Sequence, residues 1–261
     1  MIKAAFFDID GTLIPHGQER FPKSTLKALL LLKDKGIKIF IATGRPVTTI
    51  GNVLSQFDFD GYLALNGQYC NVEGHIVRDC YIPKDDIEKV LPYLINRQIS
   101  CVFAEKDYVY VNLISNQYKE FHRGKEEFMN KVDDVKRVQN HKTYQLIIFI
   151  DENQETELFH HLPNCKSARW HPMFADIIPV NGGKDKGMDA IIDYLNITLE
   201  EVIAFGDGGN DIAMLKHAGI GVAMGNASEK VKKAADYITT KDSENGIYHA
   251  LKYLNIIEEK L

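Results

Sequence analysis

Two carboxylates lie close together near the N-terminus, at the end of an apolar segment. Asp8 and Asp10 are two residues apart in the run FFDIDGTL, after apolar residues 4–7 that predict a buried strand. In an open α/β sheet, ligands collect at the carboxyl ends of the strands, so acids there face a crevice. Because an isolated D-x-D-G is by itself more typical of a turn, a phosphoryl-transfer site needs support from the rest of the chain.

A second acidic group follows another apolar strand in VIAFGDGGND, which contributes Asp207 and Asp211. Four carboxylates at one sheet edge repel one another, by about 4 kcal/mol per pair at 4 Å and an effective dielectric of 20. The group therefore needs cations, and Mg²⁺ prefers such carboxylates together with water and phosphate oxygens. Lys184, at the start of a predicted helix, supplies a further positive charge. Taken alone, GDGGND is as typical of a helix-capping turn as of a catalytic site, and Lys184 is more typical of a surface lysine.

Thr43 and Gly44 add a third element to this pattern. A hydroxyl group and exposed main-chain amides between a strand and a helix form an anion cradle. Thr-Gly turns are common, so the order of the motifs carries the argument. The chain has D-x-D-G-T, T-G-R, a lysine and G-D-x-x-N-D in sequence, each at a strand end or a helix start.

The predicted elements that position these residues alternate between strands and helices. Residues 24–35 have helical apolar spacing, IKIFIAT is a strand, and a helix follows to about Phe57. GYLALN is a further strand, and CNVEGHIVRDCY reads as a hairpin that turns at Glu73-Gly74. After Gly182-Gly183 the alternation resumes. This pattern predicts an α/β fold with a doubly wound parallel sheet.

From about Ile82 the pattern changes. We expect a helix over residues 87–97, paired strands in CVFAE and YVYVN, a helix over residues 117–132, a strand in YQLIIFID and strand-like residues over 168–178. This order predicts an α+β module of about 100 residues inserted into the doubly wound domain.

With these motifs in order, the chain resembles the haloacid dehalogenase-like phosphatases, specifically the Cof-type or IIB hydrolases, over essentially all 261 residues. The segment IGVAMGNASEKVKKAADYIT is also similar to that subgroup. The resemblance implies a Rossmann-like catalytic core over residues 1–81 and 180–261 and an α+β cap over residues 82–179. It further implies Mg²⁺-dependent hydrolysis of small phosphomonoesters, with sugar phosphates as the expected class.

The resemblance also implies roles for single residues. Asp8 is the expected nucleophile, Asp10 the general acid and base, and Asp207 a metal ligand; Asn210 and Asp211 orient phosphate, a metal-bound water or Lys184. The expected catalytic residues are Asp8, Asp10 and Lys184, the phosphate-binding residues are Thr43, Gly44, Lys184 and Asn210, and the metal-binding residues are Asp8, Asp10 (through its main-chain carbonyl), Asp207 and Asp211.

Two assignments stay open at this point. The run NGGKDKG offers both Lys184 and Lys186 as the motif lysine, and ungapped alignment favours Lys184. Arg45 is placed either to contact the substrate or to hold the helix that follows it. We expect substrate specificity to reside in the inserted module, where the candidates are Tyr108, Tyr110, Arg169, Trp170 and His171.

The composition of the chain limits the classes of binding partner that we expect. A formal charge of −5 provides no field that attracts nucleic acid or an anionic membrane. Four scattered cysteines with no C-x-x-C pair suggest neither a zinc site nor a disulfide framework. No leader pattern or long apolar run is present. We therefore expect a cytoplasmic monomer or small homo-oligomer whose partner is a small phosphorylated metabolite.

Two other functions fit parts of this pattern. A phosphotransferase or phosphomutase of the same superfamily would pass the phosphoryl group to a second hydroxyl group. A signalling receiver domain also phosphorylates an aspartate at a strand end, but it is a single domain of roughly 120 residues without the inserted module. We rank the receiver domain last.

Overall fold

Two compact units make up the chain in a computed structural model that describes residues 1–125 and 129–258. Unit 1 comprises Met1–Arg45, Thr49–Arg78 and Gly183–Leu261, and unit 2 comprises Pro46–Thr48 and Asp79–Gly182. Unit 1 is thus assembled from segments on both sides of unit 2 in the sequence. Within the described ranges, no helix combines the length and apolar character needed to cross a membrane.

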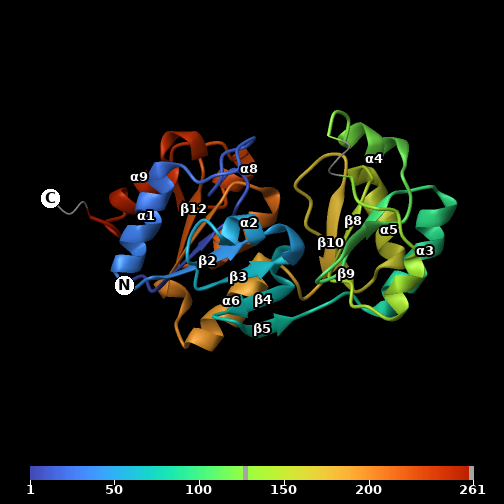
Figure 1. Ribbon diagram of the computed structural model, residues 1–261, viewed down its shortest axis with the longest axis horizontal. Coiled ribbons are helices and arrows are strands. Elements are labelled where there is room, and N and C mark those ends of the chain that lie inside the picture. The colour runs from blue at the N-terminus through green and yellow to red at the C-terminus, as the bar shows by residue number, and fades with distance from the viewer. Residues whose placement is uncertain (126–128, 259–261) are drawn as a thin grey trace. The chain divides into compact units, whose positions relative to one another are not determined.

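A mostly parallel sheet forms the centre of unit 1. Its strands are β1 (Ala4–Phe7), β2 (Lys38–Ala42), β3 (Gly61–Ala64), β4 (Tyr69–Val72), β5 (His75–Asp79), β11 (Val202–Gly206), β12 (Ile220–Ala223) and β13 (Tyr237–Ile238). Their order is β13-β12-β11-β1-β2-β3-β4-β5, so blue N-terminal strands lie beside orange and red C-terminal ones in Figure 1. β1 pairs in parallel with β11 on one side and with β2 on the other.

The central strands of this sheet are buried on both faces. Successive side chains of β1 point to opposite faces, and Phe6 stacks on Phe40 while Phe7 stacks on Phe205. Residues of α6 and α7 pack in the cluster that contains Phe6, whereas α1 contacts β2 and α9. The helices of unit 1 are α1 (Lys23–Asp34), α2 (Gly51–Leu54), α6 (Lys184–Leu195), α7 (Ile212–His217), α8 (Glu229–Lys232) and α9 (Gly246–Tyr253). The predicted α/β class with a parallel core is confirmed.

The parallel strands bring distant residues to one edge of the sheet. β1, β2, β3 and β11 run in the same direction and end at Phe7, Ala42, Ala64 and Gly206. The residues that follow each strand therefore lie at the carboxyl edge, which is where open α/β sheets bind ligands.

Unit 2 has its own antiparallel sheet and core. The strands are β6 (Cys101–Ala104), β7 (Val109–Val111), β8 (Gln145–Ile148), β9 (Cys165–Ser167) and β10 (Ala175–Pro179), and the helices are α3 (Lys84–Asn96), α4 (Asn116–Phe121) and α5 (Glu155–His161). The strand order is β7-β6-β8-β10-β9. Residues of α3 and α5 pack in one apolar cluster with Phe103 and Leu146, and Tyr118 of α4 packs in another with Val102 and Phe149. Unit 2 therefore has two apolar clusters, one that contains residues of α3 and α5 and one that contains Tyr118 of α4.

Two predicted helices are shorter than expected. The helix predicted over residues 117–132 ends at Phe121, because the chain turns at Gly124 with a φ of +74°. Lys131 and Asp133 then hydrogen bond through their main chains to Val111 of β7, so this part is extended; residues 126–128 of the prediction lie outside the described residues. The helix predicted up to Phe57 is reduced to a 3₁₀ turn and α2.

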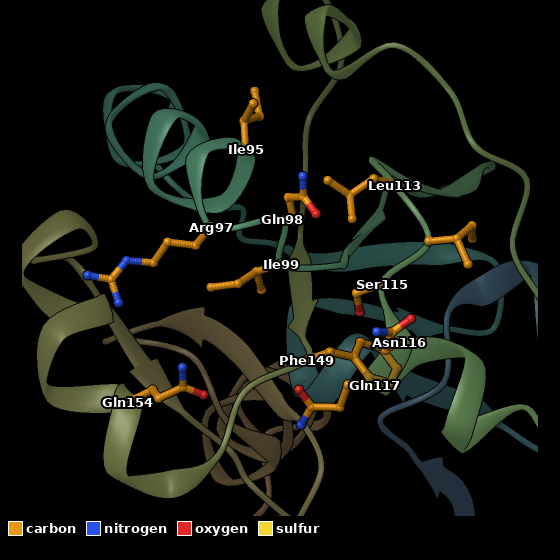
Figure 2. Close-up of a pocket in the computed structure, with 11 residues that line it drawn as sticks. Ile95, Arg97, Gln98, Ile99, Leu113, Ser115, Asn116, Gln117, Phe149 and Gln154 are labelled. Carbon is orange, nitrogen blue, oxygen red and sulfur yellow. The ribbon is translucent and has the colours of Figure 1, made fainter.

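A cleft of about 750 Å³ opens in unit 2 (Figure 2). Its lining consists of amide, hydroxyl and apolar side chains together with Arg97, which pairs with Glu157 and lies over the ring of Tyr93. The lining residues are Ile95, Arg97, Gln98, Ile99, Leu113, Ile114, Ser115, Asn116, Gln117, Phe149 and Gln154. None of these described residues is a site residue predicted from the sequence.

Candidate active site

A buried lysine joins two acidic residues at the carboxyl edge of the unit 1 sheet. Lys184 is the first residue of α6, and its Nζ atom donates to Asp8 Oδ1 at 2.6 Å and to Asp211 Oδ1 at 2.5 Å. The side chains of Lys184 and Asp211 are fully buried, and that of Asp8 is 11% exposed. Three residues that are far apart in the sequence thus form one charged group within the core.

The structure shows which of the two candidate motif lysines, Lys184 or Lys186, contacts the acidic residues. Lys186 lies two residues further along α6, is half-exposed and donates to Asp189 Oδ2 at 2.9 Å. Since one helical turn spans 3.6 residues, two positions along the helix point the side chain to a different face. Lys184 is therefore the lysine that contacts the acidic group.

Three carboxylates gather around this lysine. Asp8, Asp207 and Asp211 each offer a carboxylate oxygen, and these three atoms lie within 4.8 Å of one another. Asp207 is held in place because its Oδ1 accepts from Thr12 Oγ1 at 3.0 Å and its Oδ2 from Asn226 Nδ2 at 3.3 Å. Oxygen ligands of this kind are those that a hard divalent cation prefers.

Burial and the neighbouring charges shift the pKa values of Asp8, Asp207 and Lys184. Burial raises the pKa of Asp8 well above its usual range, Lys184 opposes this rise, and Asp211 and Asp207 add to it. Burial, with a further contribution from Asp211, raises the pKa of Asp207 to about 6. Burial alone would lower the pKa of Lys184, but Asp211 and Asp8 outweigh it and raise that pKa, so the lysine stays charged. One lysine does not neutralise three carboxylates, and the donor set fits a bound cation.

The two oxygens of Asp211 are occupied by other groups. Oδ1 accepts from Lys184, and Oδ2 accepts from the main-chain N–H groups of Asp207 and Gly208, at 3.0 and 2.9 Å. Gly206 has no room for a side chain, because a Cβ atom there would lie 2.5 Å from Asp211 Cγ. Asp211 thus fixes both Lys184 and the loop that carries Asp207.

Asp10 lies outside the group of three carboxylates. Its side chain is 52% exposed and accepts two hydrogen bonds from Arg45, Nε to Oδ2 at 2.8 Å and Nη2 to Oδ1 at 2.5 Å. Such a two-point contact fixes the plane of a carboxylate as well as its position. Arg45 therefore holds Asp10, a role that the sequence alone does not reveal.

The predicted anion cradle gathers residues from three strand ends. Thr43 is buried, and its Oγ1 accepts from the main-chain N–H of Arg45 at 3.0 Å. A Cβ atom at Gly44 would lie 3.2 Å from the side chain of Asn66 and 3.4 Å from Asn210 Nδ2. Asn210 Nδ2 donates to Asn66 Oδ1 at 2.9 Å. Thr43, Gly44 and Asn210 are thus brought together, and Asn66 joins them.

Three residues at this edge were not among the site residues predicted from the sequence: Thr12, Asn66 and Asn226. Thr12 and Asn226 hold Asp207, and Asn66 holds Asn210. Thr12 belongs to the quoted run D-x-D-G-T, and Asn66 follows the predicted strand GYLALN, so position after a strand was an available signal. Asn226 lies on the loop after β12, within the segment IGVAMGNASEKVKKAADYIT, and it also donates to the main-chain carbonyl of Gly11 at 2.9 Å.

The specificity candidates in unit 2 have local structural contacts. Tyr110 is fully buried, and Tyr108 donates to Asp133 Oδ2 at 2.9 Å. Arg169 pairs with Glu155 and donates to four main-chain carbonyls of its own unit. Trp170 and His171 also have local contacts: Trp170 is 51% exposed but donates to Asp176 Oδ2 at 3.2 Å, and the ring of His171 stacks on Phe174.

Known proteins match this chain over nearly its whole length. The family profile described as haloacid dehalogenase-like hydrolase matches residues 5–251. The solved structure of BT4131, a sugar phosphatase of subclass IIB, is 40% identical with a TM-score of 0.90 and covers 98% of this chain and 100% of its own. BT1666 from Bacteroides thetaiotaomicron is 36% identical with a TM-score of 0.92, over 98% and 96%. The 5-amino-6-(5-phospho-D-ribitylamino)uracil phosphatase YcsE of Bacillus subtilis is 26% identical over 97% and 95%.

The matched region contains all four motifs and every residue of the charged group. The resemblance inferred from the order of the motifs is confirmed. The chain therefore belongs to the haloacid dehalogenase-like hydrolases, and it is a phosphatase.

Proposed function

We propose that this phosphatase is a Mg²⁺-dependent phosphomonoester hydrolase that acts on sugar phosphates through an aspartyl-phosphate intermediate. The buried contact of Lys184 with Asp8 and Asp211, beside Asp207, is the observation that carries the proposal. The substrate class is supported by the similarity to BT4131, which is named a sugar phosphatase.

Asp8 and Asp207, together with the main-chain carbonyl of Asp10, would hold the metal ion. Mg²⁺ supplies positive charge when bound, which offsets the repulsion between a carboxylate nucleophile and a phosphate dianion. The raised pKa values of Asp8 and Asp207 support this assignment, because a cation relieves the repulsion that contributes to both shifts. Asp211 was also predicted as a ligand; in this proposal it positions Lys184 and the loop that carries Asp207, because it accepts from the lysine and from two main-chain N–H groups.

Asp8 attacks the phosphorus atom, and the bond from phosphorus to the ester oxygen breaks as the aspartyl-phosphate forms. Asp10, in its acid form, donates a proton to the leaving oxygen. A water molecule then attacks phosphorus, its proton passes to the Asp10 carboxylate, and Asp8 is released with inorganic phosphate. Both Asp10 oxygens accept from Arg45 in this structure, so this proposal requires Asp10 to leave that contact before it donates its proton to the leaving oxygen.

Lys184 and the cradle of Thr43, Gly44 and Asn210 bind the phosphate in this proposal. The lysine offsets the negative charge of Asp8, and the cradle offers a hydroxyl, a main-chain amide and a side-chain amide as donors. We assign the catalytic core to residues 1–81 and 180–261. Residues 82–179 form the cap, which selects the substrate.

The test is phosphate release from a panel of sugar phosphates by the purified protein, with Mg²⁺ and with excess EDTA. Asp8→Asn removes the nucleophile at almost constant shape and is expected to abolish turnover. Asp58→Asn is the matched control, because Asp58 is an exposed carboxylate paired with Lys33. Release that persists in EDTA or in Asp8→Asn would contradict the proposal, and a panel hydrolysed no faster than non-sugar phosphomonoesters would contradict the substrate class.

A further inference from the structure

Asn66 has an unusual main-chain conformation at the carboxyl edge of the unit 1 sheet. It follows β3 and adopts the left-handed region, with φ 55° and ψ 40°. Asparagine tolerates this region better than most residues. The side chain is nearly completely buried, and the main-chain N–H donates to the carbonyl of Thr43 at 2.9 Å. Asn66 is therefore fixed to the segment that forms the anion cradle.

The Asn66 side chain accepts a hydrogen bond from the side-chain amide of Asn210. Its Oδ1 accepts from Asn210 Nδ2 at 2.9 Å, across 144 residues of sequence. On its other side, Asn210 Oδ1 lies against Gly208, where a Cβ atom would approach it to 2.6 Å. The oxygen of the Asn210 amide thus faces its own loop, and its nitrogen faces Asn66.

Gly44 leaves space for this pair of amides. A Cβ atom at Gly44 would lie 3.2 Å from both Nδ2 and Oδ1 of Asn66 and 3.4 Å from Asn210 Nδ2. The nitrogen of Asn210 is therefore directed at the main chain that we assign to phosphate binding. A primary amide has two N–H donors, so one can bond to Asn66 while the other stays available.

We propose that Asn66 is a positioning residue of the phosphate site, which acts by fixing the amide of Asn210. The inference rests on the proposed phosphatase site. By accepting one N–H of Asn210, Asn66 prevents rotation of that amide and directs the second N–H toward a phosphate oxygen beside Gly44. A preorganised donor binds the phosphate without first paying the entropy of orientation.

The test is a double-mutant cycle on the affinity for inorganic phosphate, measured by calorimetry in Mg²⁺. Asn66→Gly removes the carboxamide and retains access to the left-handed region. Asn255→Gly is the matched control, because Asn255 is an exposed asparagine with a φ of 55° on a different loop. We expect Asn66→Gly and Asn210→Ala each to weaken phosphate binding by about 10-fold, and the double variant to be no weaker than Asn210→Ala. Asn255→Gly should bind like the wild type.

Fully additive losses, or an Asn66→Gly variant that binds phosphate like the wild type, would overturn the role of Asn66. A wild-type protein that releases no phosphate from any ester would instead overturn the proposed function. If Asn66→Gly does not fold, the side-chain amide of Asn210 is observed by NMR in the wild type. One of its two protons should be protected from exchange in the free protein, and the other should shift on addition of phosphate. Two freely exchanging protons would contradict the proposal.

Discussion

Pairing with Lys184 explains how Asp8 and Asp211 can be buried at the edge of the sheet. A buried charge is costly unless it is paired, and Lys184 pairs with two carboxylates at 2.6 and 2.5 Å. The same contact restrains Asp8 in the orientation that we assign to the nucleophile. Stability and activity therefore depend on the same lysine.

Substitutions at Lys184 and at Lys186 should have different effects, although both residues lie in α6. We expect Lys184→Met to lower kcat/KM by at least about 100-fold, because it removes a charge next to the phosphate. It should also lower the free energy of unfolding by about 3 kcal/mol, since two buried carboxylates lose their partner. Lys186→Met, at the exposed position, should leave both quantities close to wild type. Equal effects of the two substitutions, measured by kinetics and denaturant unfolding, would contradict this assignment.

Asp207 makes the metal-free protein sensitive to pH. Burial raises the pKa of this carboxyl to about 6 in the folded protein, whereas it titrates near 4 in the unfolded chain. The folded state therefore holds a proton that the unfolded state releases, and the contribution of Asp207 to stability falls as the pH rises from about 4 to 6. We expect Asp207→Asn to flatten this decline and to raise the free energy of unfolding at pH 7 by roughly 1 to 3 kcal/mol.

The measurement is urea unfolding of the metal-free protein between pH 4 and 7. Asp58→Asn serves as the control, because the pKa of Asp58 is lowered by its hydrogen bond to Lys33 and its removal should not flatten the decline. A variant at position 207 whose stability declines as steeply as that of the wild type would show that another group dominates.

Among the elements of unit 1, the first turn of α6 packs against the turn that follows β3. Gly187 lies against Gly67, and a Cβ atom at Gly187 would be 2.7 Å from Gly67 Cα. Since α6 begins at Lys184 and the turn carries Asn66, their close approach aligns the lysine with the cradle. Glycine at position 187 is required by this contact.

We therefore expect Gly187→Ala to reduce both stability and activity. The added methyl group must separate α6 from the turn, at an expected cost of about 1 to 3 kcal/mol in the free energy of unfolding, and kcat should fall with it. Gly51→Ala is the matched control, because a Cβ atom at Gly51 of α2 meets open space. Thermal unfolding and kinetics of the two variants provide the comparison, and a neutral Gly187→Ala would contradict the packing argument.

The sequence predicts the strands of this chain better than its helices, because apolar runs mark the strands whereas tertiary contacts shorten one predicted helix. β1 and β11 are apolar runs with acids at their ends, so sheet and site are visible together. The helix predicted over residues 117–132 fails after Phe121, because main-chain bonding to Val111 competes with helical spacing. Asn66 was missed for a related reason: its partner Asn210 is 144 residues away, and no local pattern records that contact.

Across the whole molecule, the two units have separate apolar cores. The predicted charged residues that the structure brings together all belong to unit 1, whereas the cleft of Figure 2 belongs to unit 2. The order of four short motifs predicted the family, because each motif lies at a strand end or at the start of a helix. The substrate was not predictable, since the four motifs contain only the residues assigned to phosphate and metal.

Separate cores predict that Mg²⁺ stabilises the units unequally. Ligand binding stabilises the folded part that forms the site, by an amount set by the ligand concentration relative to its Kd. Hydrogen exchange followed by mass spectrometry should therefore show Mg²⁺-dependent protection in peptides that contain β1 and β11. Peptides from β6 and β8 should change less. Protection confined to unit 2 would contradict the proposed metal site.

Chemical trapping during turnover can show directly whether Asp8 carries the phosphoryl group. The protein is mixed with a sugar phosphate and Mg²⁺, quenched during turnover and treated with borohydride, which reduces an acyl phosphate to an alcohol. Peptide mapping is expected to find homoserine at position 8, and no conversion when EDTA is present. Homoserine at another aspartate, or none at position 8 while phosphate is being released, would contradict the account.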